Sequence, residues 1–223
     1  MTRVKICGIT NQKDALICIK HKVDILGFVV EYPIPVPWNM PAVTAKDLIN
    51  SVSQHVNTCM VTGGSVEKIL RLAKDIKPGY VQLHYNETLE EVQLISGELK
   101  QYGIKTIKAL RIDKDGLCAY GNGNPLDAVK ELENTDISAI LIDSYTKHMP
   151  GGTGTPINLN LFNKLNRVTN MPLILAGGIK PDNVSDIVSQ SKPHAIDILT
   201  GVENAPGYKS EEKIAALMKK MVS

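Results

Sequence analysis

Short runs of β-branched and aliphatic residues alternate along the chain with longer segments whose apolar positions recur every three or four residues. In Ser65–Ile76, for example, the apolar residues share one face of a helix. The short runs predict eight strands, and the longer segments predict eight helices. The expected strands are Val4–Cys7, Ile25–Val30, Val56–Val61, Tyr80–His84, Ile104–Leu110, Ala139–Ile142, Leu173–Ala176 and Ala195–Leu199. The expected helices are Gln12–His21, Ala42–Val52, Ser65–Ile76, Glu87–Tyr102, Pro125–Glu133, Leu159–Val168, Pro181–Ser189 and Glu211–Met221.

Strict alternation of strands and helices indicates a parallel sheet, because each crossover helix returns the chain to the same edge. Eight such units in one chain of 223 residues predict a single (β/α)8 TIM barrel over residues 1–223. A doubly wound open sheet is the alternative, and eight repeats disfavour it. Pro181 is expected at the head of its helix, where the missing N–H costs nothing.

Composition narrows the class of partner. The formal net charge is +2, hydrophobic residues make up 43% and charged residues 22%. The chain has no concentrated basic stretch, which a protein that binds nucleic acid normally needs, so we expect no nucleic-acid partner. A slight positive excess is compatible with a phosphorylated small molecule, although neutral and acidic ligands are equally compatible.

The start of the chain and its cysteines predict a cytoplasmic protein. Its first ten residues lack the apolar stretch of a signal peptide, and no apolar run is long enough to suggest a membrane span. Cys7, Cys18, Cys59 and Cys118 are scattered, without metal-ligand spacing, so we expect reduced thiols and no metal site.

Catalytic groups of such barrels lie where strands end. Cys7 ends the first predicted strand, and Asp143 follows four apolar residues at the end of the sixth. Cys7 is either a small packing residue or a thiolate that acts as base or nucleophile. Asp143 is either a cap on the following loop or a general acid with a raised pKa.

Glycine-rich turns follow three strands and predict a phosphate site. Gly177 and Gly178 follow the seventh strand, and Thr200 and Gly201 follow the eighth. Turns at these two ends match the usual phosphate site of these barrels, where backbone N–H groups meet the anion, although a purely structural pair of turns is the alternative. Gly151–Gly154, with Gly152 and Gly154 as further phosphate contacts, follows the sixth strand and could also be a surface loop.

Gln82 and His84 alternate on the fourth predicted strand, so both point to one face while Val81 and Leu83 point to the other. Ligand contact and polar filling of the barrel are both compatible with this pattern.

These motifs, in order, resemble the phosphoribosylanthranilate isomerases of tryptophan biosynthesis. The resemblance covers nearly the whole chain, and its most specific element is the opening KICGIT at residues 5–10. It continues through residues 81–84, 108–111, 141–144, 151–154, 176–184 and 201–203.

The resemblance implies an Amadori rearrangement without a cofactor or metal. An acid protonates the furanose oxygen of N-(5′-phosphoribosyl)anthranilate, and a base removes the C2′ proton of the resulting Schiff base. The family's base corresponds to Cys7 and its acid to Asp143. Since the acid must be protonated while the base is deprotonated, we expect their surroundings to push the two pKa values apart.

The segment Glu31–Trp38 departs from the family, which usually carries there an arginine that pairs with the anthranilate carboxylate. No basic residue lies in this segment. Arg111, Lys147 and His148 are the cations that could substitute, and Arg111 is our predicted substrate contact. Two alternatives stay open: a paralogue acting on a different phosphoribosyl-amine, and a non-catalytic barrel that binds a phosphometabolite. A monomer and a homodimer are both compatible with the sequence.

Overall fold

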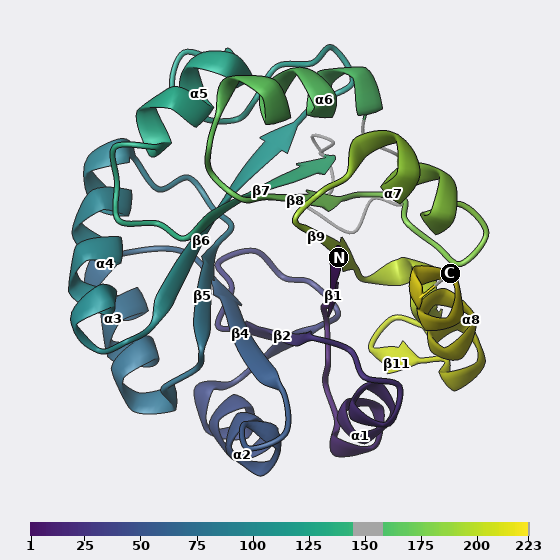
Figure 1. The fold of residues 1–223 in the computed structure, drawn as a ribbon. Helices are drawn as coiled ribbons and strands as arrows, with labels where there is room; N and C mark the ends of the chain where they lie inside the picture. The colour runs from purple at the N-terminus through teal and green to yellow at the C-terminus, as the bar shows by residue number, and fades with distance from the viewer. Residues whose placement is uncertain (145–157, 223) are drawn as a thin grey trace.

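The computed structural model describes residues 1–144 and 158–222, which form a parallel barrel surrounded by helices (Figure 1). Eight strands close the barrel, because β1 pairs with both β2 and β9. The barrel strands are β1 (Arg3–Ile6), β2 (Ile25–Val30), β4 (Asn57–Thr62), β5 (Tyr80–Leu83), β6 (Lys105–Ile112), β7 (Ala139–Ser144), β8 (Leu173–Ala176) and β9 (Ala195–Ile198). The predicted TIM barrel is therefore confirmed.

Helices follow the strands and cover the outside of the barrel. They are α1 (Gln12–Lys20), α2 (Ala42–Val52), α3 (Val66–Ile76), α4 (Leu89–Gln101), α5 (Pro125–Leu132), α6 (Leu159–Val168), α7 (Val184–Ser191) and α8 (Glu211–Val222). Three short strands and one 3-10 turn complete the elements: β3 (Asn39–Met40), β10 (Glu203–Ala205), β11 (Tyr208–Lys209) and η1 (Thr200–Val202).

The alternation of side chains along each strand produces two separate hydrophobic cores. On β2, Leu26 and Phe28 belong to the core between strands and helices, whereas Ile25 and Val29 belong to the core inside the barrel. Every residue of β2 is buried, because a parallel barrel covers both faces of its sheet. This explains why the barrel strands read as continuous apolar runs in the sequence.

Side-chain caps fix where several helices begin. Ser65 accepts a hydrogen bond from the N–H of Lys68 at the start of α3, and Thr88 and Glu91 form a capping box at the start of α4. Such caps satisfy N–H groups that have no partner within the helix. The predicted helix boundaries consequently agree with the structure within a few residues at most of these positions.

The start of α7 is an exception, and the prediction that Pro181 heads this helix is wrong. The helix begins at Val184, and residues 181–183 form a turn. The side chain of Asn183 is engaged in this turn: it accepts from the N–H of Lys180 at 2.9 Å and donates to the carbonyl of Gly178 at 2.9 Å. The turn after β8 is thereby held as a compact loop ahead of the helix.

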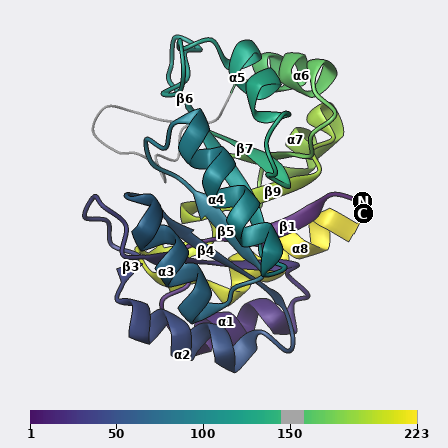
Figure 2. The same ribbon diagram turned by 90° about the vertical axis from the view of Figure 1, so that its left-hand side faces the viewer.

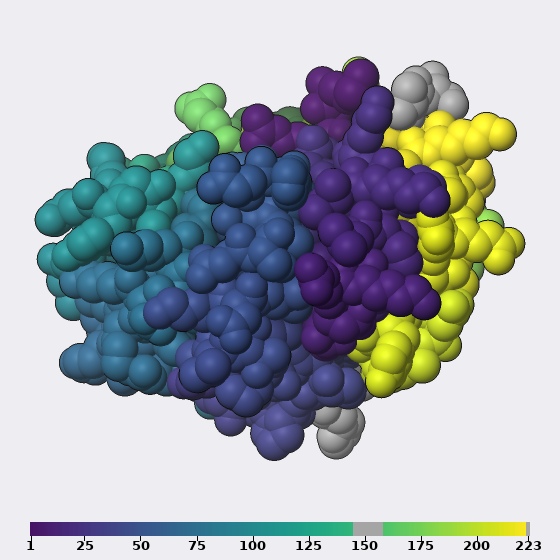
Figure 3. All heavy atoms as spheres, turned by 90° about the horizontal axis from the view of Figure 1, so that it is seen from below, coloured from purple at the N-terminus to yellow at the C-terminus, as the bar shows by residue number. Residues whose placement is uncertain are grey.

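The two ends of the chain meet on the outside of the barrel. Viewed from below, the purple N-terminal region lies directly against the yellow C-terminal region (Figure 3). Glu211 at the start of α8 accepts hydrogen bonds from Lys20 at 2.7 Å and from His21 at 3.2 Å. These contacts complete the ring of helices, while β1 and β9 complete the ring of strands. Figure 2 shows the barrel from the side, with α3 and α4 in front of its strands.

Candidate active site

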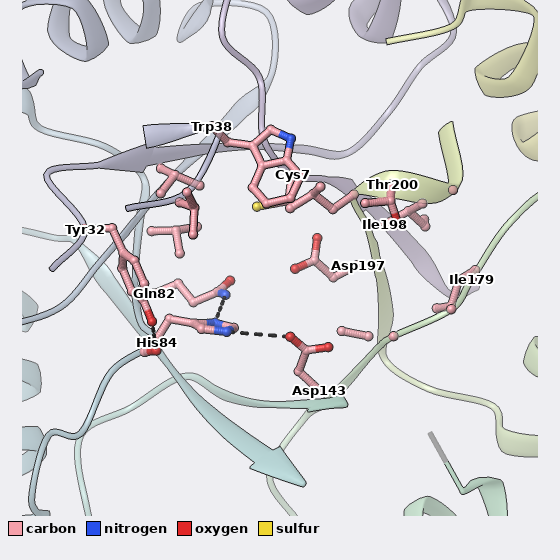
Figure 4. Close-up of a pocket in the computed structure, with 18 residues that line it drawn as sticks. Cys7, Tyr32, Trp38, Gln82, His84, Asp143, Ile179, Asp197, Ile198 and Thr200 are labelled. Atoms are coloured by element: carbon pink, nitrogen blue, oxygen red, sulfur yellow. Dashed lines mark hydrogen bonds and ion pairs between the residues drawn. The ribbon is translucent and has the colours of Figure 1, made fainter. Parts of the chain in front are cut away.

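One pocket lies at the carboxyl ends of the barrel strands (Figure 4). It brings together most of the predicted site residues, which come from five different strands or the turns after them. These are Cys7, Gln82, His84, Asp143, Gly177, Gly178, Thr200 and Gly201. Gly152 and Gly154 lie outside the described residues.

Arg111 does not line this pocket, although it lies close by. It is the register partner of Asp143 across β6 and β7, and both residues are buried at the mouth of the barrel. Its guanidinium donates a hydrogen bond to the side-chain oxygen of Asn86. Arg111 therefore contributes positive charge beside Asp143 and is already engaged with the protein.

Cys7 shares the barrel interior with a buried ion pair. The ammonium of Lys5 lies 2.7 Å from a carboxylate oxygen of Asp197, on the neighbouring strand β9. Lys5 on β1 and Cys7 directly after this strand are two positions apart, so their side chains point to the same face of the sheet. Gly27 makes room for both: a Cβ there would lie 2.8 Å from the Cys7 sulfur and 3.1 Å from the Lys5 nitrogen.

The thiol of Cys7 differs from our expectation for a base. Burial raises its pKa, and the nearby Lys5 ammonium only partly offsets that effect. A thiolate loses its hydration in the barrel interior, and one cation that is already paired with Asp197 does not replace it. The pKa of the Cys7 thiol is thus shifted upward, opposite to the direction that we expected for a base paired with Asp143.

The surroundings of Asp143 shift its pKa in the direction that a general acid requires. Burial and the negative charge of Asp197 raise its pKa to about 7, against the opposing effects of the Ser144 N–H, Lys5 and Arg111. A carboxyl group with this pKa is still substantially protonated at neutral pH. It can therefore donate a proton to a bound ligand.

Gln82 on β5 and His84, which follows the end of this strand, both line the pocket, as period two predicts. The side-chain nitrogen of Gln82 lies 2.9 Å from Nδ1 of His84, and Nε2 of His84 lies 3.6 Å from a carboxylate oxygen of Asp143. Since an amide nitrogen only donates, Nδ1 accepts and Nε2 carries the ring proton toward Asp143. The hydroxyl of Tyr32 also donates to the His84 carbonyl at 2.7 Å and thus helps to fix this segment.

Two buried oxygen atoms of the pocket have no hydrogen-bond partner among the described residues: Oε1 of Gln82 and Oδ1 of Asp197. Leaving a buried acceptor unpaired is costly. Both residues line the pocket, so a ligand with hydroxyl or N–H donors would satisfy them.

The two predicted phosphate turns lie directly against each other. Gly177 and Gly178 have φ values of 93° and 65°, which residues other than glycine rarely adopt. A Cβ on Gly201 would lie 1.9 Å from the carbonyl oxygen of Ile179. The turns after β8 and β9 therefore need glycine for their close contact, and they form one end of the pocket.

The segment after β2 forms another part of the pocket wall. Val36 and Trp38 line the pocket, and the indole nitrogen of Trp38 donates to the carboxylate of Glu203 at 2.9 Å. Glu31 is not among the lining residues: its carboxylate lies 3.5 Å from the guanidinium of Arg71. The negative charge of Glu31 is consequently directed at Arg71 and does not line the pocket.

The sequence analysis did not assign Lys5, Asp197 or Glu203 a place in or beside the site. A charged residue two positions before Cys7, in a buried strand, was a signal for Lys5, and an aspartate within the apolar run of β9 was a signal for Asp197. Glu203 is buried and also accepts from Lys209 at 2.7 Å, a partner that the sequence alone does not indicate.

Within residues 1–144 and 158–222, no cluster of three or more His, Cys, Asp and Glu residues is arranged to hold a metal ion. No helix in this part of the chain is both long and apolar enough to cross a membrane.

Comparison with known proteins agrees with this geometry. The profile of the family described as N-(5'phosphoribosyl)anthranilate (PRA) isomerase matches residues 4–220. The chain belongs to this family. Among the isomerases named for this activity, that of Methanopyrus kandleri is 34% identical over 219 residues, covering 98% of each chain. That of Methanosarcina acetivorans is 33% identical over 218 residues, covering 96% of this chain and 90% of the relative.

Solved structures of the family superimpose on this barrel. Phosphoribosyl anthranilate isomerase from Thermotoga maritima aligns with a TM-score of 0.80 and 30% identity, over 99% of this chain and 98% of that one. A further isomerase structure is a complex with reduced 1-(o-carboxyphenylamino)-1-deoxyribulose 5-phosphate, and it aligns with a TM-score of 0.77 and 28% identity over 99% of this chain and 98% of that one. The Thermotoga maritima enzyme is also described as dimeric.

Proposed function

We propose that Cys7 and Asp143 are the base and the acid with which this isomerase converts N-(5′-phosphoribosyl)anthranilate into 1-(2-carboxyphenylamino)-1-deoxyribulose 5-phosphate in tryptophan biosynthesis. The family membership supports the reaction, and the pocket supports the roles of the two residues. The single observation that carries the assignment is the meeting of a buried thiol and a carboxyl of raised pKa in one pocket, beside two glycine turns.

Asp143 acts first, as the general acid. Its protonated carboxyl donates to the furanose ring oxygen, the C1′–O bond breaks, and the lone pair of the aglycone nitrogen forms the protonated Schiff base. Asp143 is left as a carboxylate, and the N–H of His84 that faces it can stabilise that charge. The raised pKa of Asp143 favours this transfer near neutral pH.

Cys7 acts second, as the base. Its thiolate removes the proton from C2′, and the electrons of that C–H bond form the enolamine with neutralisation of the iminium nitrogen. Protonation at C1′ and loss of the hydroxyl proton at C2′ then give the ketone. The nearby ammonium of Lys5 favours the thiolate, although burial keeps the pKa of the thiol high. The catalytically active form of the pair, with Asp143 protonated and Cys7 ionised, is therefore a minor fraction of the enzyme at any pH.

The phosphate of the substrate binds between the turns at Gly177–Gly178 and Thr200–Gly201, in this proposal. Backbone N–H groups at such turns attract anions without a cationic side chain. The reaction uses proton transfers alone, so we propose that it needs no cofactor. We further propose that the enzyme is cytoplasmic and that it is a monomer or a homodimer.

The assay that tests this function follows the fluorescence of freshly prepared phosphoribosylanthranilate after addition of the protein. Loss of fluorescence at a rate proportional to protein concentration is the expected result. Binding that competes with inorganic phosphate, without turnover, would instead support a barrel that binds a phosphometabolite and does not catalyse.

A further inference from the structure

A buried carboxylate that the proposed proton transfers do not use lies beside the pocket without lining it. Glu203 begins β10, and its Oε1 atom accepts hydrogen bonds from the indole N–H of Trp38 at 2.9 Å, the N–H of Gly207 at 3.1 Å and the ammonium of Lys209 at 2.7 Å. The side chains of Glu203 and Lys209 are 4% and 0% exposed. Because desolvation largely cancels the attraction within a buried ion pair, such a pair adds little stability, and its main effect is to fix the groups that it binds.

The backbone of Glu203 is attached to the turn that contains Thr200 and Gly201. Glu203 follows η1 directly, and its N–H donates to the carbonyl of Thr200. Its own carbonyl accepts a hydrogen bond from the ammonium of Lys213 on α8 at 2.6 Å. Glu203 is thus fixed at the end of one of the two turns that we propose for the phosphate.

The side chain of Glu203 reaches the segment after β2, 165 positions earlier in the chain. The hydrogen bond that it accepts there determines which edge of the Trp38 indole faces the pocket that Trp38 lines. Figure 4 shows the indole nitrogen on the side away from Asp143 and His84. The carbon atoms of the ring therefore face the pocket, and the N–H faces Glu203.

Trp38 covers the turn that follows Cys7. A Cβ on Gly8 would lie 2.8 Å from Cδ1 of Trp38 and 3.3 Å from Cγ of Leu199, so both side chains pack on this glycine. Cys7 and Trp38 belong to the same core inside the barrel and are 5% and 6% exposed. Displacement of the indole would therefore open the surroundings of Cys7 to water.

We infer that Glu203 is a positioning residue that holds Trp38 as a cover over Cys7 and fixes this cover to the phosphate turn. Glu203 itself does not touch the substrate and acts through the indole. The consequence for turnover rests on the proposed function, in which Cys7 is the base. A base that a packed ring holds in one orientation toward C2′ reacts faster than one that water can displace, so loss of the cover should lower kcat more than it raises KM.

Two double variants separate the hydrogen bond to Trp38 from the ion pair with Lys209. Glu203→Gln/Lys209→Met (the glutamine variant) and Glu203→Leu/Lys209→Met (the leucine variant) both remove the two buried charges, so neither leaves an unpaired charge in the interior. The new side chains at position 203 are similar in size, and only that of glutamine has an oxygen that accepts from the indole. Urea unfolding of both variants shows whether they differ in stability as well as in activity.

The kinetic result should divide the two double variants. The kcat of the leucine variant should lie about three- to tenfold below that of the glutamine variant, the range that one hydrogen bond of ordinary strength supports, with KM values within about twofold of each other. Trp38→Phe removes the N–H but keeps both charges and an aromatic ring. It should lower kcat by a similar factor in the wild type and add little to the leucine variant, because both changes break the same bond.

Equal kcat in the two double variants would overturn the inference, and so would a Trp38→Phe variant with unchanged kcat if a double variant does not fold. A wild-type protein that does not turn over phosphoribosylanthranilate would instead contradict the proposed function.

The cover over Cys7 can be measured without substrate, and this readout is independent of the reaction. Trp38 is the one tryptophan of the sequence, so quenching of the protein's tryptophan fluorescence by acrylamide reports the exposure of this indole. Alkylation of Cys7 by iodoacetamide at pH 8, located by mass spectrometry, reports access to the thiol. Both double variants lack Lys209, so its charge does not affect the comparison.

The leucine variant should be quenched more strongly than the glutamine variant, and its Cys7 should be alkylated about three- to tenfold faster. Trp38→Phe should also accelerate alkylation of Cys7 relative to the wild type. Equal quenching and equal alkylation in the two double variants would overturn the inference even if their kcat values differ, because Glu203 would then not control the cover.

Discussion

Replacing Asp143 by asparagine should stabilise the fold at alkaline pH and at the same time reduce turnover. Burial and the charge of Asp197 raise the pKa of Asp143 to about 7 from an ordinary value of 3.8. Between these pH values the folded state holds a proton that the unfolded state has released, so stability falls as the pH rises and the loss is complete above pH 7. The difference between the two pKa values corresponds to at most about 4 kcal/mol. Asparagine keeps the shape and never ionises, so it escapes this cost.

Urea unfolding at pH 4 and at pH 8.5 measures the effect. Asp143→Asn should exceed the wild type by about 1–4 kcal/mol at pH 8.5 and lose most of this advantage at pH 4. The control Asp47→Asn makes the same change at an exposed position on α2 and should change stability by less than about 0.5 kcal/mol at either pH. Turnover of Asp143→Asn should fall by about 10² to 10⁴-fold. An equal stability difference at both pH values, or near-full activity, would refute the assignment of Asp143 as a buried acid.

Three further outcomes follow from the pocket. Gly201→Ala should raise KM and the inhibition constant of inorganic phosphate by at least about tenfold, because its Cβ would lie 1.9 Å from the carbonyl oxygen of Ile179 and the phosphate turn must move; unchanged phosphate inhibition would contradict the proposed phosphate site. Gly27→Ala should lower kcat more than it raises KM, because its Cβ would lie 2.8 Å from the Cys7 sulfur and displace the base; steady-state kinetics with an unchanged kcat would count against this. The active form of the pair carries one proton, on Asp143, so the pH profile of kcat/KM should be bell-shaped: it rises near pH 7, where the pair loses its first proton, mainly from Asp143, and falls only above the ordinary range of a thiol, where the pair loses its second proton, mainly from Cys7; a maximum below pH 7 would exclude this order of pKa values.

The barrel could be predicted from the sequence because the patterns that indicate its strands and helices are local. Buried strands and amphipathic helices follow periods that are visible within a dozen residues, and caps such as Thr88 mark where helices begin. The start of α7 was misplaced because Asn183 bonds within its own turn, an alternative to capping that spacing does not reveal.

The candidate site was predicted as far as strand ends determine it. Cys7, Asp143 and the glycine turns share one pocket because parallel strands of a barrel end on the same side. The ion pair of Lys5 with Asp197 joins residues 192 positions apart, and only closure of the barrel between β1 and β9 brings them together. The direction of the pKa shift at Cys7 depends on that pair and on burial, so it could not be read from the strand that carries the thiol.

The central claim is that a thiol at the barrel mouth is the base of a proton-transfer isomerase, and the turnover of Cys7→Ser tests it most directly. Wild-type protein and Cys7→Ser are compared by loss of phosphoribosylanthranilate fluorescence, with circular dichroism to verify that both are folded. Serine keeps the position and polarity of the side chain but is a far weaker base near neutral pH, so turnover should fall by about 10² to 10⁴-fold. A folded Cys7→Ser variant with near-full activity would mean that Cys7 only fills the barrel interior, and it would contradict the mechanism.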